Sequence, residues 1–123
     1  MPERREKDIQ RRTFLFAVRV LKMVRVLPRD IAGQIVARQL GRSGTSIGAN
    51  VEEAQGAQSR AEFARRMNIA LSEARETHYW LRLTGEAGLA PAARLTSIIR
   101  ETDELVCILT TILKRTRQKK NTD

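Results

Sequence analysis

Cysteine and histidine are almost absent from this chain of 123 residues, which contains one of each. The single Cys107 cannot form a disulfide within the chain, and its apolar neighbours predict a buried structural side chain in a reducing compartment rather than a reactive thiol. With one His and one Cys, no His/Cys metal site can be built. We expect the protein to bind no metal and no other cofactor.

Long apolar runs are missing as well. No stretch has the roughly 20 uncharged residues that a membrane span requires. The opening residues, MPERREKD, lack the apolar core of a signal peptide. The sequence therefore predicts a cytoplasmic protein with no membrane partner.

Catalytic motifs are also lacking. His78 belongs to no recognisable nucleophile motif and precedes an aromatic pair, which favours a packing or interface role over a catalytic one. Four carboxylates admit an acid–base role: Glu52, Glu53, Glu73 and Glu76. Neither Glu73 nor Glu76 stands three residues before a histidine, as the ligands of di-iron bundles do. We expect a protein that is not an enzyme.

Apolar residues recur at steps of three and four in four segments, which is typical of amphipathic helices, and no strand pattern competes. The first segment has two stripes, Phe14, Ala17, Leu21, Val24 and Phe16, Val20, Met23, Leu27. The second carries Ile31, Ile35, Leu40, Ile47, Val51 and Ala54, and the third carries Phe63, Met67, Ala70, Ala74, Thr77 and Leu81. The fourth carries Leu95, Ile98, Thr102, Leu105, Leu109 and Ile112 beside Ile99, Val106 and Leu113. All three phenylalanines are expected in the core.

Proline and capping residues mark where these helices begin and end. Pro28 ends the first helix, and Asp30 can cap a second that ends near Gly56. Ser59 and Glu62 have the spacing of a capping box, in which each side chain satisfies a free backbone N–H, so a third helix begins there. Left-handed residues at Gly85 and Gly88 are expected to end it, and Pro91 begins the fourth.

Short connections at residues 27–30, 56–60 and 85–91 make consecutive helices antiparallel neighbours. The sequence therefore predicts an all-α, up-down-up-down four-helix bundle as a single domain over residues 1–123, with a basic, frayed tail at 117–123. In this topology both termini and the loop near residues 57–58 lie at the same end.

Small residues line one face of the second helix. They are Gly33, Ala37, Gly41, Gly44 and Gly48, spaced four, four, three and four apart. Each glycine costs a helix about 0.5 to 1 kcal/mol relative to alanine, so close approach by another helix is expected to offset that cost. A phosphate-binding loop is the rival interpretation, but neither the spacing nor the residues after Gly48 match that motif.

A polar stripe runs beside this glycine face and consists of Arg42, Ser46, Asn50 and Glu53. It is either a solvated or interprotomer face, or a site for a ligand or partner.

The run RSGTSIGANVEEAQGA at 42–57 and the segment SRAEFARRMNIALSEARETHYWLRL at 59–83 resemble the bacterial four helix bundle protein family. That family includes proteins encoded in intervening sequences of large-subunit ribosomal RNA genes and is similar to the accessory variability proteins of diversity-generating retroelements. The resemblance implies a ring-shaped homopentamer, which favours an assembly role for the polar stripe, beside the helix packing already expected of Gly41, Gly44 and Gly48. It implies no settled activity.

Basic residues outnumber acidic ones, 23 against 14, for a formal charge of +9. Residues 1–29 have nine basic and three acidic groups, a net +6, and residues 89–123 have seven and four, a net +3. The segments 30–58 and 59–88 have net charges of −1 and +1. The basic excess in the outer segments favours an acidic partner.

Two basic groups carry the nucleic-acid hypothesis. Arg5, Arg12 and Arg19 repeat every seven residues, with Lys22 beyond them, and share one face of the first helix over roughly 25 Å. The tail adds Lys114, Arg115, Arg117, Lys119 and Lys120. We expect a non-catalytic, oligomeric scaffold that binds RNA or DNA mainly through phosphates, since few aromatic residues remain for base stacking.

Two other interpretations remain open. The basic faces can be merely solvated, or the protein can be a protein-interaction scaffold, such as an accessory protein of a reverse transcriptase, as the resemblance to retroelement proteins implies. A neighbouring reverse transcriptase gene would favour the scaffold, and placement within a ribosomal RNA gene would favour RNA.

Overall fold

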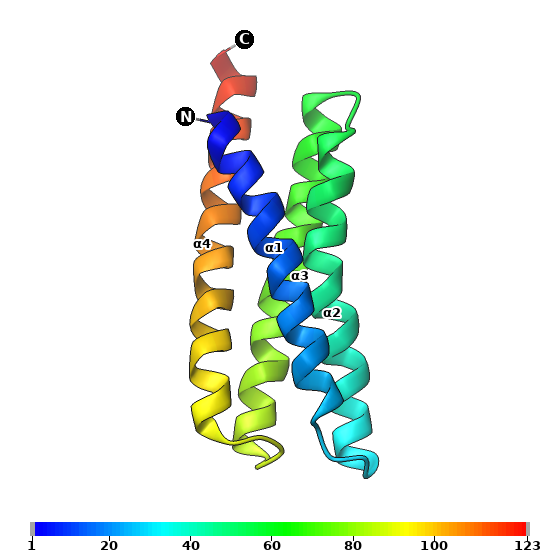
Figure 1. Ribbon diagram of the computed structural model, residues 1–123. Coiled ribbons are helices and arrows are strands. Elements are labelled where there is room, and N and C mark those ends of the chain that lie inside the picture. The colour runs from blue at the N-terminus through cyan, green and yellow to red at the C-terminus, as the bar shows by residue number, and fades with distance from the viewer. Residues whose placement is uncertain (1, 123) are drawn as a thin grey trace.

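Four antiparallel helices make up this computed structural model, which describes residues 2–122 and the side chains of residues 8–118. They are α1 (Pro2–Arg25), α2 (Ile31–Gln55), α3 (Arg60–Glu86) and α4 (Ala92–Thr122). The predicted all-α bundle is confirmed, and residues 2–122 contain no strand. Both chain ends and the α2–α3 loop lie at one end of the bundle (Figure 1). Helix α4 includes residues 117–122, where the sequence indicated a frayed tail.

Capping side chains begin α2 and α3 as their types predict. An oxygen of Asp30 accepts a hydrogen bond from the backbone N–H of Gly33 at 2.8 Å. Ser59 accepts one from the N–H of Glu62 at 3.1 Å. The Glu62 carboxylate reaches back to the N–H of Gln58 at 2.9 Å, so two backbone donors next to α3 are satisfied.

The end of α3 differs from expectation at one of its two glycines. Gly88 has φ +70°, the left-handed conformation that glycine adopts without a steric penalty. Gly85, however, lies inside α3, and the prediction of a left-handed residue there was wrong. A Cβ at Gly85 would lie 3.1 Å from Leu95 Cδ1, so the missing side chain instead makes room for α4.

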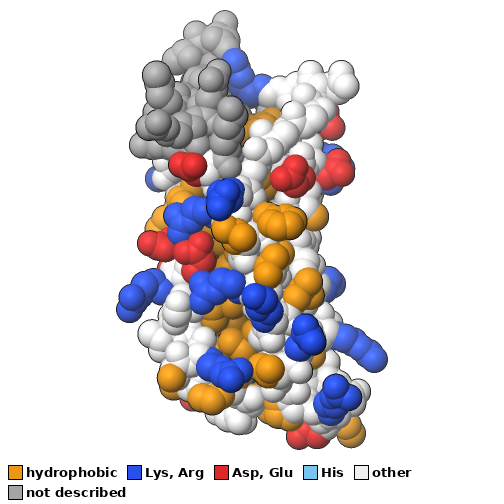
Figure 2. Space-filling model, viewed as in Figure 1, with side chains coloured by type: hydrophobic (Ala, Val, Ile, Leu, Met, Phe, Trp, Pro, Cys, Tyr) orange, Lys and Arg blue, Asp and Glu red, His pale blue; other side chains and the backbone are white. Residues whose placement is uncertain are grey.

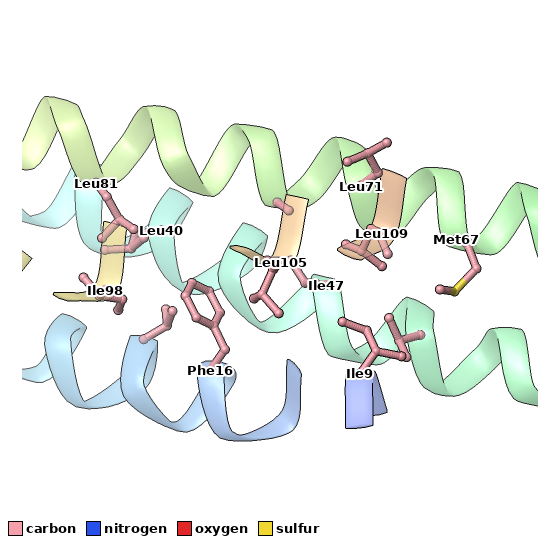
Figure 3. Close-up of a cluster of buried hydrophobic side chains, with 14 of the residues drawn as sticks. Ile9, Phe16, Leu40, Ile47, Met67, Leu71, Leu81, Ile98, Leu105 and Leu109 are labelled. Carbon is pink, nitrogen blue, oxygen red and sulfur yellow. The ribbon is translucent and has the colours of Figure 1, made fainter. Parts of the chain in front are cut away.

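One continuous core fills the space between the helices (Figure 3). Its fully buried members include Phe16 from α1, Leu40 and Ile47 from α2, Leu81 from α3 and Leu105 from α4. Every apolar residue predicted on the main stripe of the fourth helix is buried. The same holds for the third-helix stripe except Phe63, which is half-buried against the core.

Four residues of the predicted apolar stripes on the first two helices are on the surface instead of in the core. On α1, Phe14 is 65% exposed and Leu21 is 51% exposed; on α2, Ile31 is 78% exposed and Ile35 is 54% exposed. A helix buries only the stripe that faces its neighbours. On α1 that stripe is the one through Phe16, so Phe14 and Leu21 of the second stripe lie outside, while Ala17 and Val24 are half-buried.

The glycine face of α2 packs against α1 of the same chain. A Cβ at Gly44 would lie 2.7 Å from both methyl carbons of Val20, and one at Gly48 would lie 3.2 Å from the backbone oxygen of Thr13. Gly33 has a different role, because its Cβ would collide with the backbone oxygen of Pro28 in the turn before α2. Close approach of the two helices therefore depends on Gly44 and Gly48.

Helix α1 packs far more extensively on α2 than on α4. In Figure 1 it crosses diagonally in front of the bundle, near α4 at the end with the termini and away from it at the other end. The facing sides of α1 and α4, which we call the α1–α4 seam, are thus the least tightly packed junction between neighbouring helices. Basic and apolar residues line much of this seam, together with the carboxylates Glu101 and Glu104.

Candidate nucleic-acid interface

Arg12 lies in the middle of the α1–α4 seam and joins the two helices. Its Nη2 is 2.6 Å from Glu101 Oε1 and 2.9 Å from Glu104 Oε2, and its Nε donates to Glu101 Oε2 at 3.2 Å. The hydrogen bond to Glu101 raises the pKa of the Arg12 guanidinium, against the opposing effect of partial burial. Arg12, which belongs to the predicted phosphate-binding stripe, therefore forms ion pairs with α4 carboxylates that link the two helices.

Three other basic side chains converge farther along the seam. Arg19 and Lys22 from α1 and Arg94 from α4 line an opening of about 250 Å³ together with Met23 and Ile98. We call Arg19, Lys22 and Arg94 the seam cluster. No carboxylate is among its described lining residues. The cluster therefore combines three basic side chains from two helices at one opening.

Arg19 is held in place by α4, because its Nη2 donates to Ser97 Oγ at 3.0 Å. Sequence reasoning selected Arg19 and Lys22 but missed Arg94. Arg94 stands in the first turn of α4, far from them in sequence. Only the antiparallel α1–α4 pairing brings it near, and the predicted up-down-up-down topology is the signal that places the start of α4 beside the end of α1.

The predicted basic tail is only partly within the described side chains. Lys114, Arg115 and Arg117 are exposed on α4. Arg5, Lys119 and Lys120, which belong to the same hypothesis, lie outside the described side chains. The tail residues follow α4 toward the termini, whereas the seam cluster lies toward the opposite end, so the two groups are separate along the bundle (Figure 1).

The polar stripe of α2 meets α3. Arg42 forms ion pairs with Glu76 and, at 3.1 Å, with Glu73. Asn50 donates to the Ser46 backbone oxygen at 2.9 Å, and Arg66 of α3 donates to Asn50 Oδ1 at 3.5 Å. Glu53 is exposed at the end of the stripe. Arg42 and Asn50 thus bridge two helices within the chain, and this bridging accounts for much of the stripe's polarity.

Among the side chains of residues 8–118, the remaining chemically reactive groups do not gather into a site. His78 Nε2 lies 2.9 Å from Asp103 Oδ1, and its Nδ1 accepts from Arg82 at 3.1 Å, so it connects α3 to α4. In the described part of the chain, no three His, Cys, Asp or Glu residues are placed to hold a metal ion. None of the described helices has the length and apolar character needed to cross a bilayer.

Cys107 is exposed, and the prediction of a buried thiol was wrong. It lies midway between the buried Leu105 and Leu109 in sequence, and two helical steps of about 100° turn it away from the side they share. Because most residues around Cys107 are apolar, the sequence did not show which of them face the core.

The protein is thus a small helical bundle with basic residues along the α1–α4 seam. The comparisons give its family: residues 5–111 match the family described as 23S rRNA-intervening sequence protein. The chain belongs to this family. The resemblance noted in the sequence is thereby confirmed.

A solved structure supports the same assignment. It is described as a protein with unknown function from the S23 ribosomal protein family of Bacteroides thetaiotaomicron, and it is 37% identical to this chain. The match covers 89% of this chain and 98% of that one, with a TM-score of 0.84. Among curated proteins, none matches.

Proposed function

We propose that the protein is a non-catalytic scaffold that binds nucleic acid through phosphate contacts at the seam cluster. The observation that carries this proposal is the convergence of Arg19, Lys22 and Arg94 from two helices on one opening. The description of the family names an intervening sequence of 23S rRNA, which supports RNA as the nucleic acid. Basic side chains held by a rigid bundle suit a polyanion, since neutralised phosphates release counterions.

The chemistry of the cluster favours weak sequence preference. No aromatic side chain lines the opening, so bases have no stacking platform there. Tyr79 and Trp80 stack edge to face, with ring centroids 5.0 Å apart, on α3. The Trp80 indole donates to Glu76 at 2.9 Å, so it belongs to the α2–α3 polar contacts. Contacts to phosphate dominate under this proposal, and changes in ligand sequence have little effect.

We expect the triple variant Arg19→Glu, Lys22→Glu and Arg94→Glu to bind structured RNA much more weakly than the wild type. The log–log slope of affinity against salt should shrink by about 0.7 to 0.9 for each phosphate contact removed. Fluorescence anisotropy across a salt series measures both quantities. Arg12 is left unchanged because reversing its charge would break its ion pairs to Glu101 and Glu104 and confound the result.

The matched control is Arg38→Glu, Arg65→Glu and Arg75→Glu, which reverses three exposed arginines on α2 and α3 and changes the net charge equally. It should keep most of the affinity and slope. Equal weakening by both variants, or no RNA or duplex DNA binding by the folded wild type at low salt, would contradict the proposal.

We also propose that the protein forms a homo-oligomer. The family resemblance implies that this oligomer is a ring. The outer face of α1 exposes Phe14, Leu15 and Leu21, and the exposed Val26 follows directly after the helix. Figure 2 shows hydrophobic side chains interleaved with Lys and Arg on the face that α1 crosses. A second apolar group lies on α2 and α3: Ile31, Ile35, Tyr79 and Leu83. Two different apolar surfaces on one chain suit head-to-tail contacts, which close into a ring when the rotation permits.

We expect Phe14→Lys and Ile35→Lys each to lower the oligomer mass measured by light scattering, because each buries a charge in the proposed contact. Ala93→Lys, which adds the same charge at an exposed position of α4, a helix outside both apolar groups, is the control and should leave the mass unchanged. A wild type that is monomeric at all concentrations would contradict self-assembly. The same apolar surfaces would then favour the second candidate function, a scaffold for another protein such as a reverse transcriptase.

A further inference from the structure

The end of the α1–α4 seam nearest the termini holds a groove that neither the seam cluster nor the proposed assembly contact uses. Its volume is about 570 Å³. The floor is apolar: Ile9 and Ile112 are buried, and Ile108 is half-buried against the core. The exposed rim consists of Asp8, Arg11, Cys107, Thr111 and Arg115, and Arg12 closes one side.

The charge of the rim identifies what the groove can hold. Among the lining residues whose side chains the structure describes, there are three arginines and one carboxylate, Asp8. Arg12 is already paired with Glu101 and Glu104, which leaves Arg11 and Arg115 as the guanidiniums that can meet an incoming anion. They come from opposite walls, α1 and α4. An acid group between them could accept two parallel hydrogen bonds from each planar guanidinium. Carboxylates match this bidentate geometry.

We propose that this groove binds a small anionic amphiphile, with its apolar chain on the isoleucine floor and its carboxylate between Arg11 and Arg115. The volume falls within the range of about 300 to 1,000 Å³ typical of small-molecule sites. A polynucleotide suits the groove poorly, because phosphates would leave the isoleucines uncovered and no aromatic lining residue stacks with a base. A fully apolar ligand would leave the arginines without a partner.

Cys107 provides a site-specific test, since it is the only thiol in the chain and lies on the rim. The probe is dodecanoate, used below its micelle concentration. We expect it to slow alkylation of Cys107 in the intact protein at least tenfold at saturation. Dodecanol and dodecyltrimethylammonium, which have the same chain without a negative charge, should protect far less at the same concentration.

Arginine variants distinguish binding in this groove from general electrostatic attraction of dodecanoate to a basic protein. Arg11→Gln with Arg115→Gln should weaken dodecanoate binding at least about tenfold, by loss of two charge-assisted contacts. Arg19→Gln with Arg94→Gln removes the same charge at the seam cluster and should leave dodecanoate binding unchanged. Ile108→Trp, which fills the groove, should abolish protection of Cys107 while leaving RNA affinity intact. The last comparison distinguishes failure of this proposal from failure of the nucleic-acid proposal.

The proposal is overturned if dodecanoate gives no protection of Cys107 in the wild type, or if the cationic amphiphile protects equally. It is also overturned if the Arg19 and Arg94 variant loses as much affinity as the Arg11 and Arg115 variant. Thermal melts establish that each variant is folded. Direct calorimetric titration of the Cys107→Ser variant with dodecanoate provides a second measurement that does not depend on the thiol, and absence of heat there would count against the site.

Discussion

Gly44→Leu is expected to destabilise the bundle by about 3 kcal/mol, a large part of the 5–15 kcal/mol that stabilises a typical domain. Even a single Cβ at this position would lie 2.7 Å from both Val20 methyl carbons. Val20 is fully buried and β-branched, so it cannot rotate away cheaply. Helix α1 would have to move away from α2. Guanidinium denaturation followed by circular dichroism measures the loss.

Gly41→Ala is the matched control on the same face. A Cβ there would meet only Val24 Cγ2 at 3.8 Å, which is an ordinary contact. Replacing a helical glycine by alanine then stabilises by about 0.5 to 1 kcal/mol. Opposite effects at two glycines one turn apart would show that close packing, and not helix propensity, determines the glycine at position 44. Unchanged unfolding of Gly44→Leu would contradict this explanation.

Gly48→Leu is expected to act in the same direction, with a cost of about 1 to 3 kcal/mol. Its Cβ meets the backbone oxygen of Thr13 at 3.2 Å, and a backbone atom has no alternative rotamer. The sequence predicted that another helix packs on these glycines. The spacing of the glycines could not show whether that helix belongs to the same chain, because it describes only α2 and does not identify the helix that packs on it.

Helix type and order were predictable because they depend on local signals. Asp30 and Ser59 cap the helices they precede, and the heptad-like stripe of α4 is buried along its length. Which of two apolar stripes faces inward was less predictable. On α1 both the Phe14 and the Phe16 stripes have helical spacing, and only the position of α2 and α4 decides between them.

The basic residues illustrate the same limit. Spacing placed Arg12 and Arg19 on one face, and the structure places both at the α1–α4 seam. Spacing alone could not reveal that Glu101 and Glu104 form ion pairs with Arg12, because those carboxylates come from α4, about 90 residues away in sequence. Long-range pairing therefore decides which charges stay available for a ligand, and the count of basic residues alone overstates the interface.

Phe16→Ala is expected to cost about 3 to 5 kcal/mol, whereas Phe14→Ala should change the free energy of unfolding by no more than about 0.5 kcal/mol. Phe16 is 1% exposed and packs in the core that all four helices share, so its loss leaves a cavity. Phe14 is 65% exposed. Two phenylalanines two residues apart thus differ only in the side of α1 on which they lie.

The pair is compared by chemical denaturation in dilute solution, with light scattering to record the mass of each variant. If Phe14 contributes to assembly, Phe14→Ala should lower the mass at higher concentration while the dilute protein keeps its stability. A large loss of stability in dilute Phe14→Ala, matching that of Phe16→Ala, would mean that both stripes are buried. The assignment of the Phe14 stripe to the surface would then be wrong, and with it the outer apolar face of α1 on which the assembly proposal depends.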